Sequence, residues 1–301
     1  MAYVPPPLPE AQKQRGFATL AEQVTKLHDF AANPRQRVRV GIESLDILTE
    51  GPAAGEIYEF MGRSFSGKSL VATNIMANNP EMPMIFFSLE MPARQALTRL
   101  YATYENVDHH AIQDQVKAGS LPRLFDDLPD KLPYQVIVDR SGMTLDDMSF
   151  HVDLYETYFD LRPSAVLIDY LELIRSSDGE GHFRTEMVAK RLKDWSKTED
   201  VAVFLLHQTN RTEPEWEAPT SDSARGAGFT EADVVVGMWQ PSRNPKLSLG
   251  EREAVTGEIH MNVLKNRING RTTNGAPIRL RLDDNLRMVD LSADATRKFY
   301  R

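Results

Sequence analysis

The chain of 301 residues is long enough for one large α/β domain with a small appendage, and too short for a second large domain. Its 35 lysines and arginines are outnumbered by 43 acidic residues, and the formal charge of -8 excludes a surface that is basic all round, so any DNA contact must be local. The absence of cysteine excludes disulfides and thiolate metal sites, and no apolar run reaches the roughly 20 residues that a membrane span requires. We therefore expect a cytoplasmic protein without membrane contacts.

The N-terminal segment predicts a tail followed by one short helix. Residues through Pro9 are proline-rich, which favours an extended chain. Over residues 17–31 the apolar side chains recur at steps of three and four and form one stripe: Phe17, Leu20, Val24, Leu27 and Ala31. Either the main domain or a neighbouring subunit must cover this stripe. We expect residues 1–36 to form this appendage, a candidate docking linker, and residues 37–301 to form the main domain.

Eight consecutive residues then match the phosphate-binding loop G-x-x-x-x-G-K-[ST]: Gly62, Arg63, Ser64, Phe65, Ser66, Gly67, Lys68 and Ser69. Residues 55–61 before the loop alternate like a strand, and residues 70–76 after it have helical spacing, which is the context that this motif requires. The glycines allow backbone N–H groups to surround phosphates. Lys68 is expected to reach the β- and γ-phosphates of ATP, and the Ser69 hydroxyl to bind Mg²⁺. A chance match in an ordinary turn is the weaker alternative.

Beyond the loop, strand-like and helix-like segments alternate. This pattern predicts a P-loop α/β fold with a mostly parallel central sheet and helices on both faces. The apolar runs that predict buried strands are Ile57–Met61, Met84–Ser88, Gln135–Asp139, Ala165–Asp169, Ala202–His207 and Val234–Trp239. Near the C-terminus, two further strands, Glu258–Lys265 and Ile278–Leu282, flank turn signals and predict an antiparallel hairpin at one sheet edge.

Three predicted strands end in polar residues that suit an ATPase. Asp169 ends an apolar run and is the second candidate ligand of Mg²⁺, acting through water, although such an aspartate is often only a turn residue. Glu90 follows another strand and is the candidate general base, or an acid that favours the N-terminus of the next helix. Gln208 is the candidate sensor of the γ-phosphate, whereas its neighbour His207 fits a structural histidine.

Five ordered blocks after the loop resemble the motor domain of DnaB-type replicative helicases: Ser88–Pro92, Leu167–Leu173, Gln208–Arg211, Ala232–Val235 and Lys265–Arg267. The resemblance covers residues 38–289. It implies a RecA-like ATPase that assembles into a ring, usually hexameric, around single-stranded DNA, with ATP bound between subunits. It also implies that Lys265 and Arg267 reach the neighbouring subunit's nucleotide, Arg267 as an arginine finger. By spacing alone, the two residues would be a solvated pair on a hairpin.

The resemblance also implies DNA-contacting loops after the strands that end at Asp169 and Gln208. The loops of residues 175–184 and 211–229 contain four candidate phosphate-binding residues: Arg175, Arg184, Arg211 and Arg225. Against this, the second loop carries three acidic residues, at positions 213, 215 and 217, that would repel a DNA backbone. Individual assignments of these arginines therefore stay open.

The expected function is an ATP-driven helicase or translocase on single-stranded DNA, with replication or recombination proteins as possible partners. We expect only a tail and one short helix before the motor domain, without the family's amino-terminal domain that meets primase, so the chain resembles single-domain helicases of phages and plasmids. Three alternatives stay open: a RecA- or RadA-like recombination ATPase, a helicase loader or regulatory ATPase, and a nuclease that uses acids such as Asp126 and Asp127.

Overall fold

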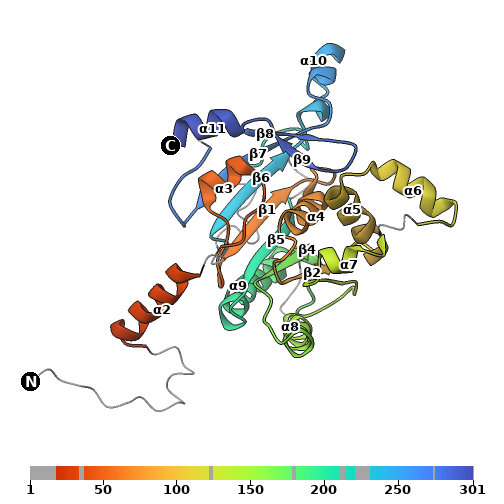
Figure 1. Cartoon of the computed structure of the whole chain (residues 1–301). Coiled ribbons are helices and arrows are strands. Elements are labelled where there is room, and N and C mark those ends of the chain that lie inside the picture. Colours follow the sequence, from red (N-terminus) through yellow and green to blue (C-terminus); the bar gives the residue numbers. More distant parts are fainter. Residues whose placement is uncertain are drawn as a thin grey trace, which may run out of the picture. The chain divides into compact units, whose positions relative to one another are not determined.

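The computed structural model describes residues 18–33, 37–121, 125–177, 181–209, 214–220, 231–273 and 275–300. Residues 18–33 belong to one unit, and the described residues from Arg37 onward belong to another, the motor unit. The helices are α2 (Leu20–Ala32), α3 (Glu43–Thr49), α4 (Lys68–Asn78), α5 (Ala93–Glu105), α6 (His109–Lys117), α7 (Leu128–Lys131), α8 (Leu145–Phe159), α9 (Gly181–Thr198), α10 (Leu249–Ala254) and α11 (Ala293–Tyr300) (Figure 1). The strands are β1 (Ile57–Gly62), β2 (Met84–Ser88), β3 (Gln135–Val138), β4 (Ala165–Asp169), β5 (Ala202–Gln208), β6 (Val234–Trp239), β7 (Glu258–Asn266), β8 (Ile278–Leu282) and β9 (Met288–Asp290).

Helix α2 begins with a capping box. The Thr19 side chain accepts a hydrogen bond from the backbone N–H of Glu22, and the Glu22 carboxylate accepts one from the backbone N–H of Thr19. This cap starts the helix three residues later than the predicted Phe17, which lies outside the described residues. The predicted apolar stripe is present but exposed: none of the α2 residues is buried, and Leu20 is 85% exposed.

Within the described residues the strands form one nine-stranded sheet in the order β3-β2-β4-β5-β1-β6-β7-β8-β9. Neighbouring strands from β3 to β6 are parallel, and β7, β8 and β9 continue the sheet as antiparallel strands. The predicted architecture, a mostly parallel sheet with an antiparallel C-terminal edge, is therefore confirmed. Strand β1, which carries the phosphate-binding loop, lies in the parallel part of this sheet with a neighbour on each side (Figure 1).

Both faces of the sheet are covered, which explains why its strands are apolar on both sides. Tyr58 and Phe60 of β1 face one core, to which α3, α4 and α5 contribute apolar side chains. Ile57 and Met61 face the other core, which α8 and α9 complete. All six residues of β1 are buried, and so are all six of β6. The loop that follows β1 therefore starts from a rigid and fully packed strand.

Each predicted strand is present within two residues of its predicted bounds. One loop prediction is partly wrong: α9 begins at Gly181, so Arg184 lies in its first turn and not in a loop. The sequence predicts this helix only from Thr185 onward, because Phe183 in the first turn is 62% exposed and adds no apolar position on the core-facing side. The short strand β9 was not predicted, and neither were the helices α3, α6, α7, α8, α10 and α11. No helix in the described part of the chain is both long enough and apolar enough to cross a bilayer.

Candidate nucleotide-binding site

The phosphate-binding loop joins the end of β1 to the start of α4. Gly62 is the last residue of β1, and Gly67 caps α4 with a φ of 93°. A Cβ atom on Gly67 would lie 2.7 Å from Cδ1 of Ile259, and one on Gly62 would lie 2.6 Å from Oγ of Ser66. Only glycine fits at these two positions. The loop is thus held close to β1, at a helix N-terminus where backbone N–H groups favour an anion.

Lys68, the first residue of α4, directs its ammonium group back over the loop. Its Nζ donates hydrogen bonds to the carbonyl oxygens of Gly62 at 2.8 Å and of Arg63 at 2.7 Å. Burial lowers the pKa of Lys68 to about 8, although the carboxylates of Asp169 and Glu172 favour the charged form. A nearby phosphate would favour the ammonium further, because negative charge stabilises the protonated lysine.

Asp169 provides a buried carboxylate next to the loop. It is the last residue of β4 and is 1% exposed. Burial raises its pKa, while a hydrogen bond from the Ser69 side chain lowers it. Its Oδ2 atom has no hydrogen-bond partner among the described residues. A buried carboxylate oxygen of this kind beside a serine hydroxyl fits Mg²⁺, which prefers oxygen ligands.

Two more charged side chains, both from the segment that follows β2, lie near Lys68 and Asp169. Glu90 lies between β2 and α5, and Arg99 lies on α5; both line the cavity that the loop borders. Burial lowers the pKa of Arg99, while the carboxylates of Asp169 and Glu90 favour its charged form. Arg99 was not predicted from the sequence. The sequence offers one indication of its role: Arg99 lies four residues after Gln95, which also lines the cavity, so both side chains lie on one face of α5.

We expect Glu90→Gln to hydrolyse ATP about 10²- to 10⁴-fold more slowly while binding nucleotide normally, because the amide keeps the shape of the side chain but cannot accept a proton. Steady-state hydrolysis and equilibrium binding of a fluorescent nucleotide would measure the two effects. Glu253→Gln, at an exposed position of α10, is the matched control and should behave like the unmodified protein. Normal hydrolysis by Glu90→Gln would show that another group activates the water.

Gln208, the last residue of β5, connects the loop with a buried histidine. Its Nε2 donates to Oγ of Ser64 at 2.7 Å, and its backbone N–H donates to Oε1 of Glu172 at 3.2 Å. Nδ1 of His207 lies 2.5 Å from Oε1 of Glu59, and Nε2 lies 3.3 Å from Oε1 of Glu172. Burial disfavours the charged imidazole, but the hydrogen bond and charge of Glu59, with the charge of Glu172, raise the pKa of His207. His207 thus has the contacts of a buried structural histidine.

These groups border one cavity of about 820 Å³, which lies within the usual size range of small-molecule sites. Predicted site residues that line it are Ser64, Phe65, Gly67, Lys68, Ser69, Glu90, Asp169 and Gln208. Arg243 also lines the cavity, and its guanidinium carbon lies 4.8 Å from the centre of the Phe65 ring. The remaining predicted loop residues, Gly62, Arg63 and Ser66, are not among those that line the cavity. The structure therefore brings the loop together with the residues proposed for metal binding, water activation and γ-phosphate sensing.

Lys265 and Arg267 are not among the residues that line this cavity. Lys265 lies level with Glu59 of β1, since both residues pair with Val235 of β6. The phosphate-binding loop starts at Gly62, three residues further along β1, roughly 10 Å at about 3.3 Å per residue. Because β7 runs antiparallel to β6, Arg267 lies further still from the loop of its own chain. Burial lowers the pKa of Lys265 to about 8, and the charge of Arg267 acts in the same direction.

The candidate DNA-binding arginines are only partly described. Arg175 is exposed, and its backbone N–H donates to the carbonyl of Met143 at 2.8 Å. Arg184 is half-buried, and its Nη2 donates to the carbonyl of Glu172 at 3.3 Å. Arg211 and Arg225 lie outside the described residues, as does most of the predicted second loop.

Residues 37–283 match the family model described as the DnaB-like helicase C terminal domain. Among curated proteins, the replicative DNA helicase DnaB of Pasteurella multocida is 29% identical over 213 residues, which are 65% of this chain and 44% of that helicase. The DnaB helicase of Haemophilus influenzae is 28% identical over 210 residues, again 65% of this chain and 44% of the relative. The chain thus spans less than half the length of these two relatives.

Solved structures show the same fold. The ATPase domain of another protein matches with a TM-score of 0.74 at 17% identity, over 91% of this chain and 99% of that domain. A DnaB-like replicative helicase, solved to show its interactions with primase, matches with a TM-score of 0.72 at 17% identity, over 91% of this chain and 67% of that one. These neighbours confirm the expected RecA-like ATPase fold, and the family implies nucleotide binding. The chain belongs to the family of DnaB-like helicase C-terminal domains.

Proposed function

We propose that this protein hydrolyses ATP between the subunits of a hexameric ring and uses the energy to move along single-stranded DNA as a helicase. One observation carries the proposal. Lys68, Glu90, Asp169 and Gln208 border one cavity, whereas Arg267 follows the end of β7, level with the start of β1 and away from that cavity. The cavity of one subunit therefore lacks two of the proposed groups, Lys265 and Arg267, and a neighbouring copy can supply them.

Within the cavity each side chain has a distinct role. Lys68 compensates the charge of the β- and γ-phosphates. Ser69 and Asp169 would hold Mg²⁺, Asp169 through water, and the ion would add its positive charge to that of Lys68 in compensating the phosphate oxygens. Glu90 accepts a proton from the attacking water. Gln208, which bonds Ser64 in the loop, responds to the γ-phosphate and passes the change to the segment after β5.

Lys265 and Arg267 complete the site of the next subunit. Arg267 is exposed, so its guanidinium group is accessible to another chain. An arginine supplied in this way stabilises the charge that spreads over the transferring phosphoryl group. Hydrolysis then depends on the relative position of two neighbouring subunits. Each cycle of ATP binding and hydrolysis is therefore coupled to movement of the subunits within the ring.

For DNA binding we propose the segments that follow β4 and β5, in which Arg175, Arg184 in the first turn of α9, Arg211 and Arg225 contact phosphates. The exposed apolar stripe of α2 is proposed to dock on an adjacent subunit, as a linker that stabilises the ring. Replication or recombination proteins are the proposed partners, because the curated relatives are replicative helicases.

DNA-stimulated hydrolysis tests the proposal. We expect single-stranded DNA to raise the steady-state rate of ATP hydrolysis, and light scattering of the same samples to give about six times the chain mass of 34.0 kDa. A forked duplex should then be unwound only with ATP. Binding to single strands should weaken steeply with salt, as phosphate contacts require. Hydrolysis that is indifferent to DNA would favour a loader or regulatory ATPase.

A further inference from the structure

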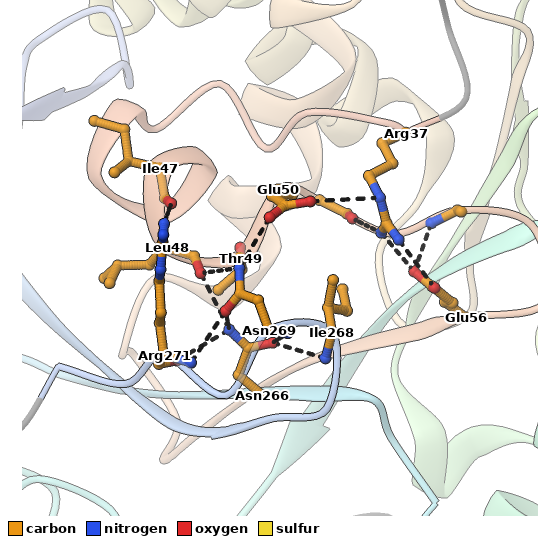
Figure 2. A network of polar contacts seen from close by, with 12 residues as sticks. Arg37, Ile47, Leu48, Thr49, Glu50, Glu56, Asn266, Ile268, Asn269 and Arg271 are labelled. Carbon is orange, nitrogen blue, oxygen red and sulfur yellow. Dashed lines mark hydrogen bonds and ion pairs between the residues drawn. The ribbon is translucent and has the colours of Figure 1, made fainter. Parts of the chain in front are cut away.

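The loop that carries Arg267 is bound to the end of a helix far away in the sequence. We call residues 267–271, which follow β7, the finger loop. Figure 2 shows Asn266, Asn269 and Arg271 gathered beneath the last turn of α3. Nδ2 of Asn266 donates to the carbonyl oxygen of Leu48 at 3.1 Å, and Nδ2 of Asn269 donates to the same oxygen at 3.0 Å. Nη1 of Arg271 donates to the carbonyl of Ile47 at 3.4 Å.

These bonds satisfy carbonyl groups that α3 cannot pair internally. The last four carbonyls of a helix lack partners within the helix, and side-chain donors commonly supply them. Helix α3 is itself fixed, because its Leu45 and Leu48 are 0% and 2% exposed in the core. The finger loop is therefore attached to a rigid part of the motor unit.

The side chains of the same two asparagines also accept hydrogen bonds from backbone N–H groups of the finger loop itself. Oδ1 of Asn266 accepts hydrogen bonds from the backbone N–H groups of Ile268 at 3.0 Å and Asn269 at 3.4 Å. Oδ1 of Asn269 accepts from the N–H of Arg271 at 3.0 Å. Ile268 packs against the hydrophobic core. The side chains on both sides of Arg267, those of Asn266 and Ile268, thus point toward the protein interior and fix the loop, while Arg267 itself is exposed.

Asn269 has a further contact that leads to the start of the motor unit. Its Nδ2 donates to Oε1 of Glu50 at 3.0 Å, and Oε2 of Glu50 lies 3.9 Å from Nε of Arg37 (Figure 2). Arg37 in turn donates to Oε2 of Glu56 at 2.8 Å. The network joins the finger loop, the end of α3 and the first residue of the motor unit.

We propose that Asn266 and Asn269 are positioning residues for Arg267. They fix the finger loop on α3, so that the guanidinium group meets the neighbouring nucleotide at one place and one angle. An arginine on a loose loop would lose conformational freedom at each turnover, and small displacements from the reactive geometry strongly reduce rates. This inference rests on the proposed function, since it assumes that Arg267 acts on the site of another subunit.

Asn269→Ala tests the proposal, because it removes the bonds to Leu48 and Glu50 but leaves Arg267 in place. We expect kcat for ATP hydrolysis to fall on the order of tenfold or more, with an unchanged Kd for a fluorescent nucleotide. Asn269→Asp keeps the size and the Oδ1 acceptor but cannot donate to Leu48 or Glu50, so it should show the same defect. The Asp variant keeps the test valid should the alanine variant fold poorly.

Asn79→Ala is the matched control. Asn79 also binds carbonyls at a helix end, since its Nδ2 donates to Ile75 at 2.7 Å and to Arg39 at 2.9 Å, but it lies at the end of α4. We expect this variant to lose a similar amount of stability in thermal unfolding and to keep its kcat. Equal losses of kcat in the Asn79 and Asn269 variants would overturn the proposal.

Mixed rings separate positioning from general damage. Subunits with Asn269→Ala keep an intact cavity, and subunits with Lys68→Ala keep an intact finger loop. Co-expressed rings of the two variants should therefore hydrolyse ATP faster than either variant alone, and no such recovery would overturn the proposal. If Arg267→Ala is inactive but Asn269→Ala is fully active, the positioning role is wrong and the shared site stands. Full activity in both variants would instead contradict the proposed function.

Discussion

Arg267→Ala is expected to lower ATP turnover by about a thousandfold or more, the range seen when an arginine finger is removed. Nucleotide binding should stay normal, because Arg267 lies away from the cavity of its own chain. The loss arises only in the transition state, where negative charge on the phosphoryl oxygens needs a cation. A fall in kcat without a change in the Kd for nucleotide would be the signature of this role.

Steady-state hydrolysis and equilibrium binding of a fluorescent nucleotide measure these two quantities. Arg281→Ala is the matched control: Arg281 is an exposed arginine on β8, the strand that pairs with β7, and its side chain is 57% exposed. We expect the control to keep both turnover and binding. Full turnover by Arg267→Ala would mean that the site is complete within one chain.

Lys68→Ala is expected to reduce hydrolysis by at least about a hundredfold, since the side chain compensates charge on the phosphates through the transition state. Nucleotide binding should weaken as well, because the ammonium group also contacts the ground state. The fold should persist: the Nζ hydrogen bonds that the substitution removes go to the adjacent loop, at Gly62, Arg63 and Ser66.

Circular dichroism would verify the fold, and hydrolysis and nucleotide binding would be measured on the same preparation. Lys117→Ala provides the control, because Lys117 lies on α6 with a side chain that is 74% exposed. The assignment of Lys68 would be wrong if its alanine variant hydrolysed ATP as fast as this control.

Much of the sheet could be predicted because its strands are continuous apolar runs buried on both faces. Ala165–Asp169 and Val234–Trp239 have the bounds that the sequence predicted. Helix α8 was missed because Phe150, Leu154 and Tyr158 are exposed, so apolar side chains lie on two of its faces and the periodicity is blurred. Strand β9 has only three residues, too few for a pattern.

In the candidate site, too, residues marked by a local sequence pattern could be predicted, and residues brought there by tertiary packing could not. The loop residues and the strand-terminal Glu90, Asp169 and Gln208 are recognisable because their chemistry follows directly on a strand. Arg99 enters the cavity only through the packing of α5, which no local pattern reveals. The bond between Asn269 and Glu50 joins residues 219 positions apart, so only the folded chain shows it.

The most direct test of the shared site is to mix Lys68→Ala and Arg267→Ala subunits in one ring and to measure ATP hydrolysis. Each variant alone should be nearly inactive, since one lacks a working cavity and the other lacks the finger. Interfaces that pair the intact cavity of one variant with the intact finger of the other should restore hydrolysis. A mixture that stays as inactive as its components would contradict hydrolysis between subunits.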